Sequence, residues 1–267
     1  MKRIIVTLLA VAMLLSACAV AEGQFRVGME CDYPPFNWTQ LEPGENTVPI
    51  EGGMGYAGGY DVEIAKRIAD GLGLELVIVK REWNGLIPSL TSDQIDAVIA
   101  GMSPTEERKI SVDFTDAYYN SDLVIVVRKD GPYASATKLS DFAGAKITGQ
   151  QNTFHYSVID QIEGVNKQPA QKTFPAMIVS LSSGAIDGYI SERPGAVSAV
   201  ASNPDLTFVV LEDGFEASVE DTSVAVAVKQ GQPERIEAIN AILSGISEDE
   251  RNALMDDAVL NQPLSAE

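Results

Sequence analysis

An arginine that follows a serine within a short turn-like segment gives the chain its clearest capacity for chemistry. Ser103 and Arg108 lie in the sequence AGMSPTEER, which begins at the end of the apolar strand-like run Ala97–Ala100. A guanidinium presents a rigid fork of N–H donors that matches a carboxylate, and a hydroxyl with neighbouring turn amides can complete the cage. The pair therefore indicates capture of a small carboxylate. The alternative, which these residues alone leave open, is a surface turn in which Arg108 pairs with a nearby acidic side chain.

The elements around this segment alternate between helix and strand, as in an α/β protein with largely parallel sheets. Tyr60–Leu72 carries apolar residues at helical spacing, and the β-branched run Glu75–Lys80 follows it as a strand. A second unit leads from a short helix at Leu86–Leu90 to the strand Ala97–Ala100. Ligands of open α/β sheets lie outside the carboxyl ends of the strands, so the position of Arg108 favours a binding site.

The same alternation continues to the end of the chain. We expect further strands at Phe25–Met29, Leu123–Arg128, Ala145–Thr148, Asp187–Ser191 and Ser223–Val228. We expect further helices at Thr153–Gln161, Pro175–Ser182, Glu192–Ala201, Pro233–Ile246 and Glu248–Ala258. The glycine-rich segment Thr39–Gly59 is expected to be the least structured part, a long connection. Its sequence GGMGYAGG does not directly follow a strand and open a helix, as a phosphate-binding loop does.

The first residues have the layout of a secretory signal peptide. Lys2 and Arg3 precede an apolar run from Ile4 to Leu15, which small residues follow. The run is shorter than the roughly 20 apolar residues of a transmembrane helix. We therefore expect residues 1–21 to be a signal peptide and the protein to be exported. The residues before Cys18 resemble a lipobox, which would make Cys18 a lipid anchor at the cell surface. An Ala-Val-Ala tripeptide after it fits ordinary cleavage and a periplasmic protein.

The composition narrows the classes of partner. The 267 residues include 38 acidic and 19 basic side chains, and a formal net charge of −19 argues against nucleic acid or an anionic membrane as partner. Cys18 and Cys31 are the two cysteines, so the fold does not depend on disulfides, and we expect Cys31 to be a small buried residue. The one histidine, His155, has no second histidine or cysteine to complete a metal site, so neither a metal nor a cofactor is predicted.

Seven motifs follow one another along the chain: Asp32–Phe36 (DYPPF), Gly59–Ala69 (GYDVEIAKRIA), Trp83–Leu90 (WNGLIPSL), Ala100–Arg108, Asp113–Tyr119 (DFTDAYY), Gly184–Ile190 and Ser223–Lys229. In this order they resemble the motifs of the polar amino-acid-binding proteins of bacterial ABC importers, solute-binding protein family 3. The resemblance covers essentially the whole chain after the signal peptide. It is carried by the order and spacing of the set rather than by any one motif.

This resemblance implies a periplasmic-binding-protein-like type II fold, with two α/β lobes, two hinge strands and a ligand cleft between the lobes. Residues 25–122 and 223–267 would form lobe 1, and residues 123–222 would form lobe 2. The hinge strands would be Leu123–Arg128 and Ser223–Val228.

The resemblance also implies a place for the carboxylate of an amino-acid ligand. Arg108, Ser103 and the backbone around Gly101 would bind it, in agreement with the chemistry of the two side chains. The second lobe would add the loop Asn152-Thr153, which opens a helix whose N-terminus favours an anion. Asn152 stands where the family has glycine.

The ammonium group of the ligand would fall to Glu192, at a position where the family has aspartate. A longer carboxylate can still pair with an ammonium group, although the ligand would shift or a water molecule would intervene. The alternative is that Glu192 caps its helix or pairs with Arg193.

The side chain of the ligand would lie against Glu30, Tyr33, Phe36 and Trp83. The three rings would supply apolar walls, although each is also suited to an ordinary core. Glu30 lies where family members that recognise cationic or amide side chains carry an acid, and a buried carboxylate needs such a partner. We therefore expect a basic or polar amino acid: arginine, histidine, lysine or glutamine. His155 would lie at the surface or in the lobe 2 part of the pocket.

The function expected from this resemblance is that of an extracytoplasmic solute-binding component, which captures a free L-amino acid by hinge closure and delivers it to the ABC permease. It would be a monomer and not an enzyme. The alternatives are an exported amino-acid sensor with the same pocket, and a dehydratase-like enzyme on a related fold with Glu192 or His155 as the acid.

Overall fold

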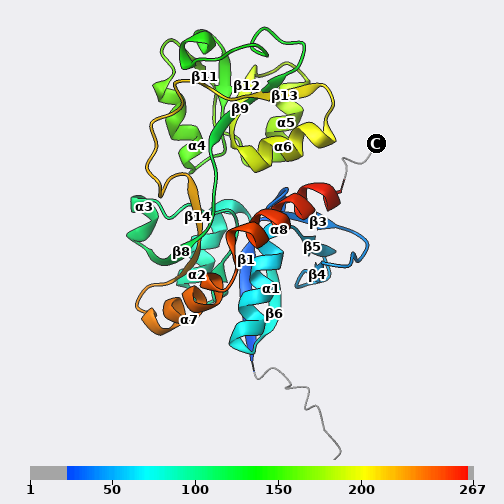
Figure 1. The fold of residues 1–267 in the computed structure, drawn as a ribbon, viewed down its shortest axis with the longest axis vertical. Coiled ribbons are helices and arrows are strands. Elements are labelled where there is room, and N and C mark those ends of the chain that lie inside the picture. The colour runs from blue at the N-terminus through cyan, green and yellow to red at the C-terminus, as the bar shows by residue number, and fades with distance from the viewer. Residues whose placement is uncertain (1–22, 264–267) are drawn as a thin grey trace, which may run out of the picture.

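The computed structural model describes residues 23–263, so the predicted signal peptide at residues 1–21 and the predicted lipid anchor Cys18 lie outside the described residues. The chain forms two α/β lobes, as predicted, each built on a five-stranded sheet (Figure 1). No helix among the described residues is long and apolar enough to cross a membrane.

The first lobe holds the sheet of order β6-β1-β7-β14-β8. Its strands are β1 (Gln24–Met29), β6 (Glu75–Lys80), β7 (Ala97–Val98), β8 (Val112–Asn120) and β14 (Ser223–Lys229). β1 is parallel to β6 and β7, whereas β14 is antiparallel to β7 and β8. The helices of this lobe are α1 (Tyr60–Leu72), α2 (Leu86–Thr91), α3 (Glu106–Lys109), α7 (Pro233–Ser244) and α8 (Glu248–Asn261), with a 3₁₀ turn at Trp83–Gly85.

Helix α1 shows how the sequence pattern produces this packing. Its apolar residues at helical spacing are buried, and α1 packs against β6, α7 and α8. It ends at Gly73, whose φ of 68° supplies the left-handed cap that glycine adopts without strain. The two C-terminal helices thus return to the first lobe (Figure 1).

The second lobe holds the sheet of order β11-β10-β12-β9-β13. Its strands are β9 (Leu123–Arg128), β10 (Lys146–Thr148), β11 (Asn166–Lys167), β12 (Gly188–Glu192) and β13 (Leu206–Val209). Its helices are α4 (Phe154–Ser157), α5 (Phe174–Ser182) and α6 (Arg193–Ser202), with 3₁₀ turns at Leu139–Phe142 and Val158–Gln161. The predicted helix Thr153–Gln161 is wrong in its second half, because the chain tightens into the 3₁₀ turn after one turn of α4.

The segment Thr39–Gly59, which was predicted to be the least structured part of the chain and a long connection, contains short strands. It contributes to a small sheet of order β2-β3-β5-β4, formed by β2 (Asp32–Tyr33), β3 (Asn37–Gln40), β4 (Val48–Pro49) and β5 (Tyr56–Gly58). Strands of two to four residues are too short to show an alternating pattern. Gly59 has a φ of 119°, and a side chain there would collide with the carbonyl oxygen of Phe36.

The chain passes between the lobes twice, from β8 to β9 and from β13 to β14 (Figure 1). The amide of Ser121 in the first crossing donates to the carbonyl of Thr222 in the second at 3.0 Å, so the two crossings run together. β9 and β14, the predicted hinge strands, each begin directly after a crossing. Gln262, after α8, adds a contact between the lobes because it exchanges hydrogen bonds with Ser198 on α6.

A buried polar network lies beneath the space between the lobes. Asp61 accepts hydrogen bonds from the Tyr118 hydroxyl at 2.6 Å and from the Asn37 amide at 2.7 Å. The Tyr118 hydroxyl in turn accepts from the amide of Gly101 at 3.2 Å, and Asn37 accepts from the amide of Cys31 at 2.6 Å. Burial raises the pKa of Asp61 to about 6. The network therefore fixes the two loops that follow β1 and β7.

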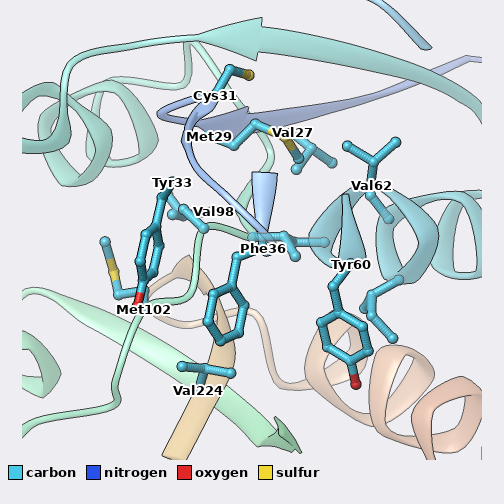
Figure 2. Packing of buried hydrophobic residues seen from close by; sticks show 14 of the residues in the cluster. Val27, Met29, Cys31, Tyr33, Phe36, Tyr60, Val62, Val98, Met102 and Val224 are labelled. Atoms are coloured by element: carbon cyan, nitrogen blue, oxygen red, sulfur yellow. The ribbon is translucent and has the colours of Figure 1, made fainter. Parts of the chain in front are cut away.

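Cys31 is a free thiol buried in the core, as predicted. It lies close to Met29 at the end of β1, where Tyr33, Phe36 and Tyr60 continue the packing (Figure 2). Burial raises the pKa of the Cys31 thiol to about 12, which keeps it protonated and unreactive near neutral pH.

Replacement of Tyr118 by phenylalanine is expected to lower the free energy of unfolding by about 1–3 kcal/mol, because it leaves the Gly101 amide unpaired and Asp61 without one donor. Urea unfolding followed by circular dichroism measures this change. Tyr119→Phe is the matched control, since the Tyr119 hydroxyl has no hydrogen-bond partner recorded within residues 23–263. Equal unfolding midpoints for the two variants would show that the network does not hold the loops.

Candidate ligand-binding site

A small cavity between the lobes brings most of the predicted site residues together. Its lining includes seven of them, namely Tyr33, Trp83, Gly101, Ser103, Arg108, Thr153 and Glu192, together with Gln150, Phe154 and His155. The cavity volume is about 10 Å³, which is the space of roughly one water molecule. Larger hollows flank it, one of about 520 Å³ beside Arg108 and one of about 320 Å³ beside Glu30.

Arg108 points its guanidinium into the space between the lobes. Nη1 donates to the carbonyl of Ser103 at 2.8 Å, and Nη2 donates across the gap to the carbonyl of Asn152 at 3.0 Å. The guanidinium carbon lies 5.1 Å from the centre of the Trp83 ring, a cation–π contact. Arg108 forms no ion pair with the surrounding acids within residues 23–263, and Glu106 pairs with Lys109 instead. Burial lowers the pKa of Arg108 to about 10, so the group remains charged near neutral pH.

Ser103 and Gly101 lie beside Arg108, but their polar groups are already engaged. The Ser103 hydroxyl donates to the carbonyl of Asp221 in the second crossing at 3.1 Å, and the Gly101 amide is directed to Tyr118. Gly101 has a φ of 59°, and a side chain there would meet the Tyr33 ring at 3.1 Å. Glycine therefore permits the close approach of Tyr33 to this loop.

Asn152, in the loop that the second lobe contributes, stands where the family has glycine. Asn152 has a φ of 56°, in the left-handed region that asparagine tolerates better than most residues, so it adopts a backbone conformation suited to glycine. Its side-chain amide donates to Asn84 of the first lobe at 2.9 Å. The Thr153 hydroxyl donates to the carbonyl of Gln150 at 2.7 Å. Because α4 is a single turn, it contributes little of the helix dipole that was predicted to favour an anion.

Glu30 is buried at the other end of the cleft, where it meets a residue that the sequence interpretation missed. The Gln150 amide donates to both oxygens of Glu30, at 3.1 and 3.0 Å, and to the carbonyl of Lys172 at 2.9 Å. Burial raises the pKa of Glu30 to about 7. The only sequence signal for Gln150 was its place two residues before the loop Asn152-Thr153.

The aromatic residues divide between pocket and core. Tyr33 stacks on Phe36 at 5.0 Å and on Phe174 of the second lobe at 4.1 Å, and its buried hydroxyl has no hydrogen-bond partner. Trp83 lines the cavity, and its indole donates to the Asn152 carbonyl at 3.4 Å. Phe36 is fully buried against Tyr33 and Tyr60, so it belongs to the core rather than to the cavity wall (Figure 2). Phe174, at the start of α5, was not predicted.

Glu192 is buried against His155 on the second-lobe side of the cavity. Oε1 of Glu192 lies 3.0 Å from Nε2 of His155. Glu192 makes no side-chain cap on α6, and Arg193 lies 3.4 Å from Asp122 instead, so both alternative roles proposed for Glu192 are wrong. Burial raises the pKa of Glu192 to about 8 and, with Arg108 nearby, lowers the pKa of His155 to about 3.

Within residues 23–263, the second oxygen of Glu192 and the Nδ1 atom of His155 are buried without hydrogen-bond partners. Buried polar atoms in proteins are almost always paired, so these two atoms indicate a place where a polar group can bind. A guanidinium from one lobe and a carboxylate from the other thus face one cavity, an arrangement suited to a zwitterion. No group of three metal-ligating side chains was found among the described residues.

Comparisons with known proteins agree with this arrangement. The family pattern of the bacterial extracellular solute-binding proteins, family 3, matches residues 25–258. The arginine-binding extracellular protein ArtP of Bacillus subtilis is 31% identical over 206 residues, which cover 76% of this chain and 73% of that protein. The probable histidine-binding protein of Campylobacter jejuni is 31% identical over 192 residues, covering 72% and 69%.

A solved structure is similar over nearly its whole length. The amino acid ABC transporter substrate-binding protein AbpA of Streptococcus pneumoniae, bound to L-arginine, superposes with a TM-score of 0.76 and 28% identity over 89% of this chain and 95% of that chain. The predicted resemblance to the amino-acid-binding proteins of ABC importers is confirmed. The chain belongs to the bacterial extracellular solute-binding proteins of family 3.

Proposed function

We propose that this protein is the extracytoplasmic solute-binding component of an amino-acid ABC importer, which captures a polar or basic L-amino acid between its lobes and delivers it to the membrane permease. The observation that carries the proposal is a guanidinium and a carboxyl group that face one cavity from opposite lobes. Arg108 and Glu192 line the same cavity, and Glu192 has an unpartnered oxygen there. An α-amino acid offers the matching carboxylate and ammonium groups.

The ligand carboxylate would take the place that the Asn152 carbonyl holds on Arg108. A carbonyl oxygen and a carboxylate oxygen accept the same N–H donors, and a carboxylate accepts them more strongly because it is charged. Replacement of the Asn152 carbonyl by the ligand carboxylate on Arg108 is therefore favourable. Ser103 lines the same cavity, and its hydroxyl would turn from the Asp221 carbonyl toward the same carboxylate.

The ligand side chain would run toward Glu30, past the rings of Tyr33, Trp83 and Phe174. Gln150 now supplies the N–H donors that pair with Glu30, and an ammonium, guanidinium, imidazole or amide group of a ligand can supply them instead. Arginine, histidine, lysine and glutamine all fit this requirement. Arginine is the ligand named for several of the relatives, which supports its place first among the four.

Entry of the ligand requires the lobes to separate, because a cavity of about 10 Å³ cannot hold an amino acid. The two crossings at residues 121–122 and 210–222 would absorb the rotation, with residues 25–122 and 223–267 moving against residues 123–222. The closed form would then be stabilised by the ligand and by contacts between the lobes, among them the hydrogen bond from Asn152 to Asn84.

Replacement of Glu30 by glutamine is expected to change ligand preference. A cationic ligand would lose a charged hydrogen bond worth about 1.5–3 kcal/mol, whereas glutamine as ligand would lose about 1 kcal/mol or less. Isothermal titration calorimetry with L-arginine and L-glutamine measures the difference. Glu42→Gln, which changes an exposed carboxylate of the connection Thr39–Gly59, is the control. An equal loss for both ligands would remove the proposed role of Glu30 in side-chain recognition.

The proposal is tested by a thermal-shift screen of the purified protein, unfolded and refolded to remove carried-over ligand, against the twenty amino acids. A ligand that binds the native state raises the melting temperature by mass action, by an amount that grows with its concentration. A shift with one or a few polar or basic amino acids is the expected result. The absence of a shift with any amino acid would contradict the proposal and favour another class of solute.

A further inference from the structure

His155 and Glu192 form a buried pair that the family resemblance did not assign. The ring of His155 packs edge-on against Phe174 at 5.9 Å, which holds the imidazole in place beside Glu192. One oxygen of Glu192 faces His155 Nε2, and both residues line the cavity. The other oxygen of Glu192 and Nδ1 of His155 are buried with no hydrogen-bond partner among residues 23–263. Two such atoms on residues that line one cavity indicate that a hydrogen-bonding group binds here.

The pair also holds a proton when no ligand ammonium group lies beside it. Burying a net charge is costly, so the pair is most stable as a neutral acid and a neutral ring, or as the ion pair with the same number of protons. The directions of the two pKa shifts agree with this, since burial raises the pKa of Glu192 to about 8 and lowers that of His155 to about 3. In the neutral form the acid donates to Nε2, and Nδ1 carries the ring proton.

A ligand ammonium group reverses this preference. An ammonium at the free oxygen of Glu192 requires an ionised carboxylate, and the neutral ring of His155 then donates its one proton from Nε2 to the other oxygen. Compared with the empty pair, one proton is surplus and passes to solvent. The charge of the ammonium replaces the charge of the lost proton, so the site remains neutral.

We propose that His155 is a positioning residue of the amino-group site, which acts through Glu192, and that the ammonium group of an arriving amino acid displaces one proton from the His155–Glu192 pair into solvent. This inference rests on the proposed function, because it needs an amino acid in the cavity. It adds a residue to the site and a dependence of affinity on pH.

The other titratable groups that face the cavity are Arg108, from the first lobe, and the hydroxyl of Tyr33. Burial lowers the pKa of Arg108 to about 10, so Arg108 does not titrate between pH 5 and 8. Glu30 does not line the cavity, but it lies behind Gln150, and burial raises its pKa to about 7. A cationic ligand side chain could therefore release a second proton from Glu30, and the test must separate the two carboxylates.

The sign of the pH effect follows from the proton count. The free protein holds more protons than the complex, so acidification favours the free protein. Affinity is expected to fall as the pH drops through about 8, with a slope that approaches tenfold per pH unit for one released proton. A site with an ionised carboxylate in both states would show no such fall.

The experiment is isothermal titration calorimetry of the purified, refolded protein with L-glutamine and L-arginine near pH 6.5, in two buffers of different ionisation enthalpy. The difference in apparent binding enthalpy gives the number of protons released. We expect about 0.5–1 proton with L-glutamine, whose side chain does not ionise Glu30. We also expect the Glu30→Gln variant to retain this release.

The protonation of the His155 ring provides the second readout. His155 is the one histidine of the 267 residues, so nitrogen NMR of its ring reports which ring nitrogen carries the proton. The proton is expected on Nδ1 in the free protein and on Nε2 in the complex with L-glutamine, a change that a merely structural role of His155 would not produce. Binding by the wild-type protein without proton release, or a ring proton that stays on the same nitrogen in both states, would overturn this inference alone. The absence of binding of any amino acid would overturn the proposed function as well.

Discussion

Replacement of Arg108 by alanine is expected to weaken the binding of every amino acid by about 2–5 kcal/mol, which is the usual cost of truncating one partner of a desolvated, hydrogen-bonded charge pair. Arg108 lies between the ring of Trp83 and the Asn152 carbonyl, and it is the one guanidinium that lines the cavity among the described residues. Without it, the ligand carboxylate would be enclosed with no opposite charge beside it. Isothermal titration calorimetry at a fixed pH measures the loss.

Arg26→Ala is the matched control, since Arg26 pairs with Glu51 at the surface of the first lobe, away from the cleft. This variant is expected to bind like the wild-type protein. The loss in Arg108→Ala should be the same for arginine, histidine, lysine and glutamine, because all four carry the α-carboxylate. A folded Arg108→Ala variant with unchanged affinity would show that the carboxylate binds elsewhere.

Replacement of Glu192 by glutamine is expected to weaken amino-acid binding by a similar amount, about 2–5 kcal/mol, because the ammonium group would be buried without a counter-charge. The free energy of unfolding, in contrast, should rise in this variant. Burial raises the pKa of Glu192 from 4.5 to about 8, so the folded state binds a proton more tightly than the unfolded state does. The stability therefore falls as the pH rises from about 4.5 to 8, and glutamine removes this penalty.

The combined result distinguishes a ligand contact from a structural one. Glu192→Gln should melt at or above the wild-type temperature near pH 7 and yet bind amino acids poorly. Glu237→Gln, which changes an exposed carboxylate on α7, should alter neither property. A large loss of stability in Glu192→Gln, without a loss of affinity, would contradict the assignment of the ammonium group to this residue.

The lobes could be predicted because their strands and helices carry strong local signals. Helix α1 and the strands β6, β9 and β14 show long apolar runs or regular spacing that any packed α/β layer requires. The small sheet of β2 to β5 and the edge strand β13 show no comparable pattern. They are defined by pairing with distant segments, such as β13 with β9, and a single segment does not reveal such pairing.

The site could be predicted on its first-lobe side better than on its second-lobe side. Arg108 and Trp83 belong to local motifs, so their spacing was informative. Gln150 meets Glu30 across 120 residues of sequence, and His155 meets Glu192 only because α4 and β12 lie next to each other in the second lobe. Neither contact produces a pattern of residue spacing that the sequence alone would reveal.

Asn152 and Phe36 show two further limits of the sequence. Asn152 stands where the family has glycine and adopts a left-handed backbone conformation, which asparagine tolerates. Its residue type alone did not predict this conformation. The sequence suited Phe36 equally to the pocket and to the core. Phe36 packs in the core because it contacts Tyr60, which begins the following helix. Both outcomes depend on the folded backbone rather than on residue type.

The most direct test of zwitterion capture between Arg108 and Glu192 compares L-arginine with agmatine, which has the same side chain but no carboxylate. Isothermal titration calorimetry on refolded protein gives both dissociation constants under one set of conditions. The account predicts that L-arginine binds and that agmatine binds about 30-fold or more weakly, which corresponds to about 2 kcal/mol or more. Equal affinities for the two compounds would contradict it.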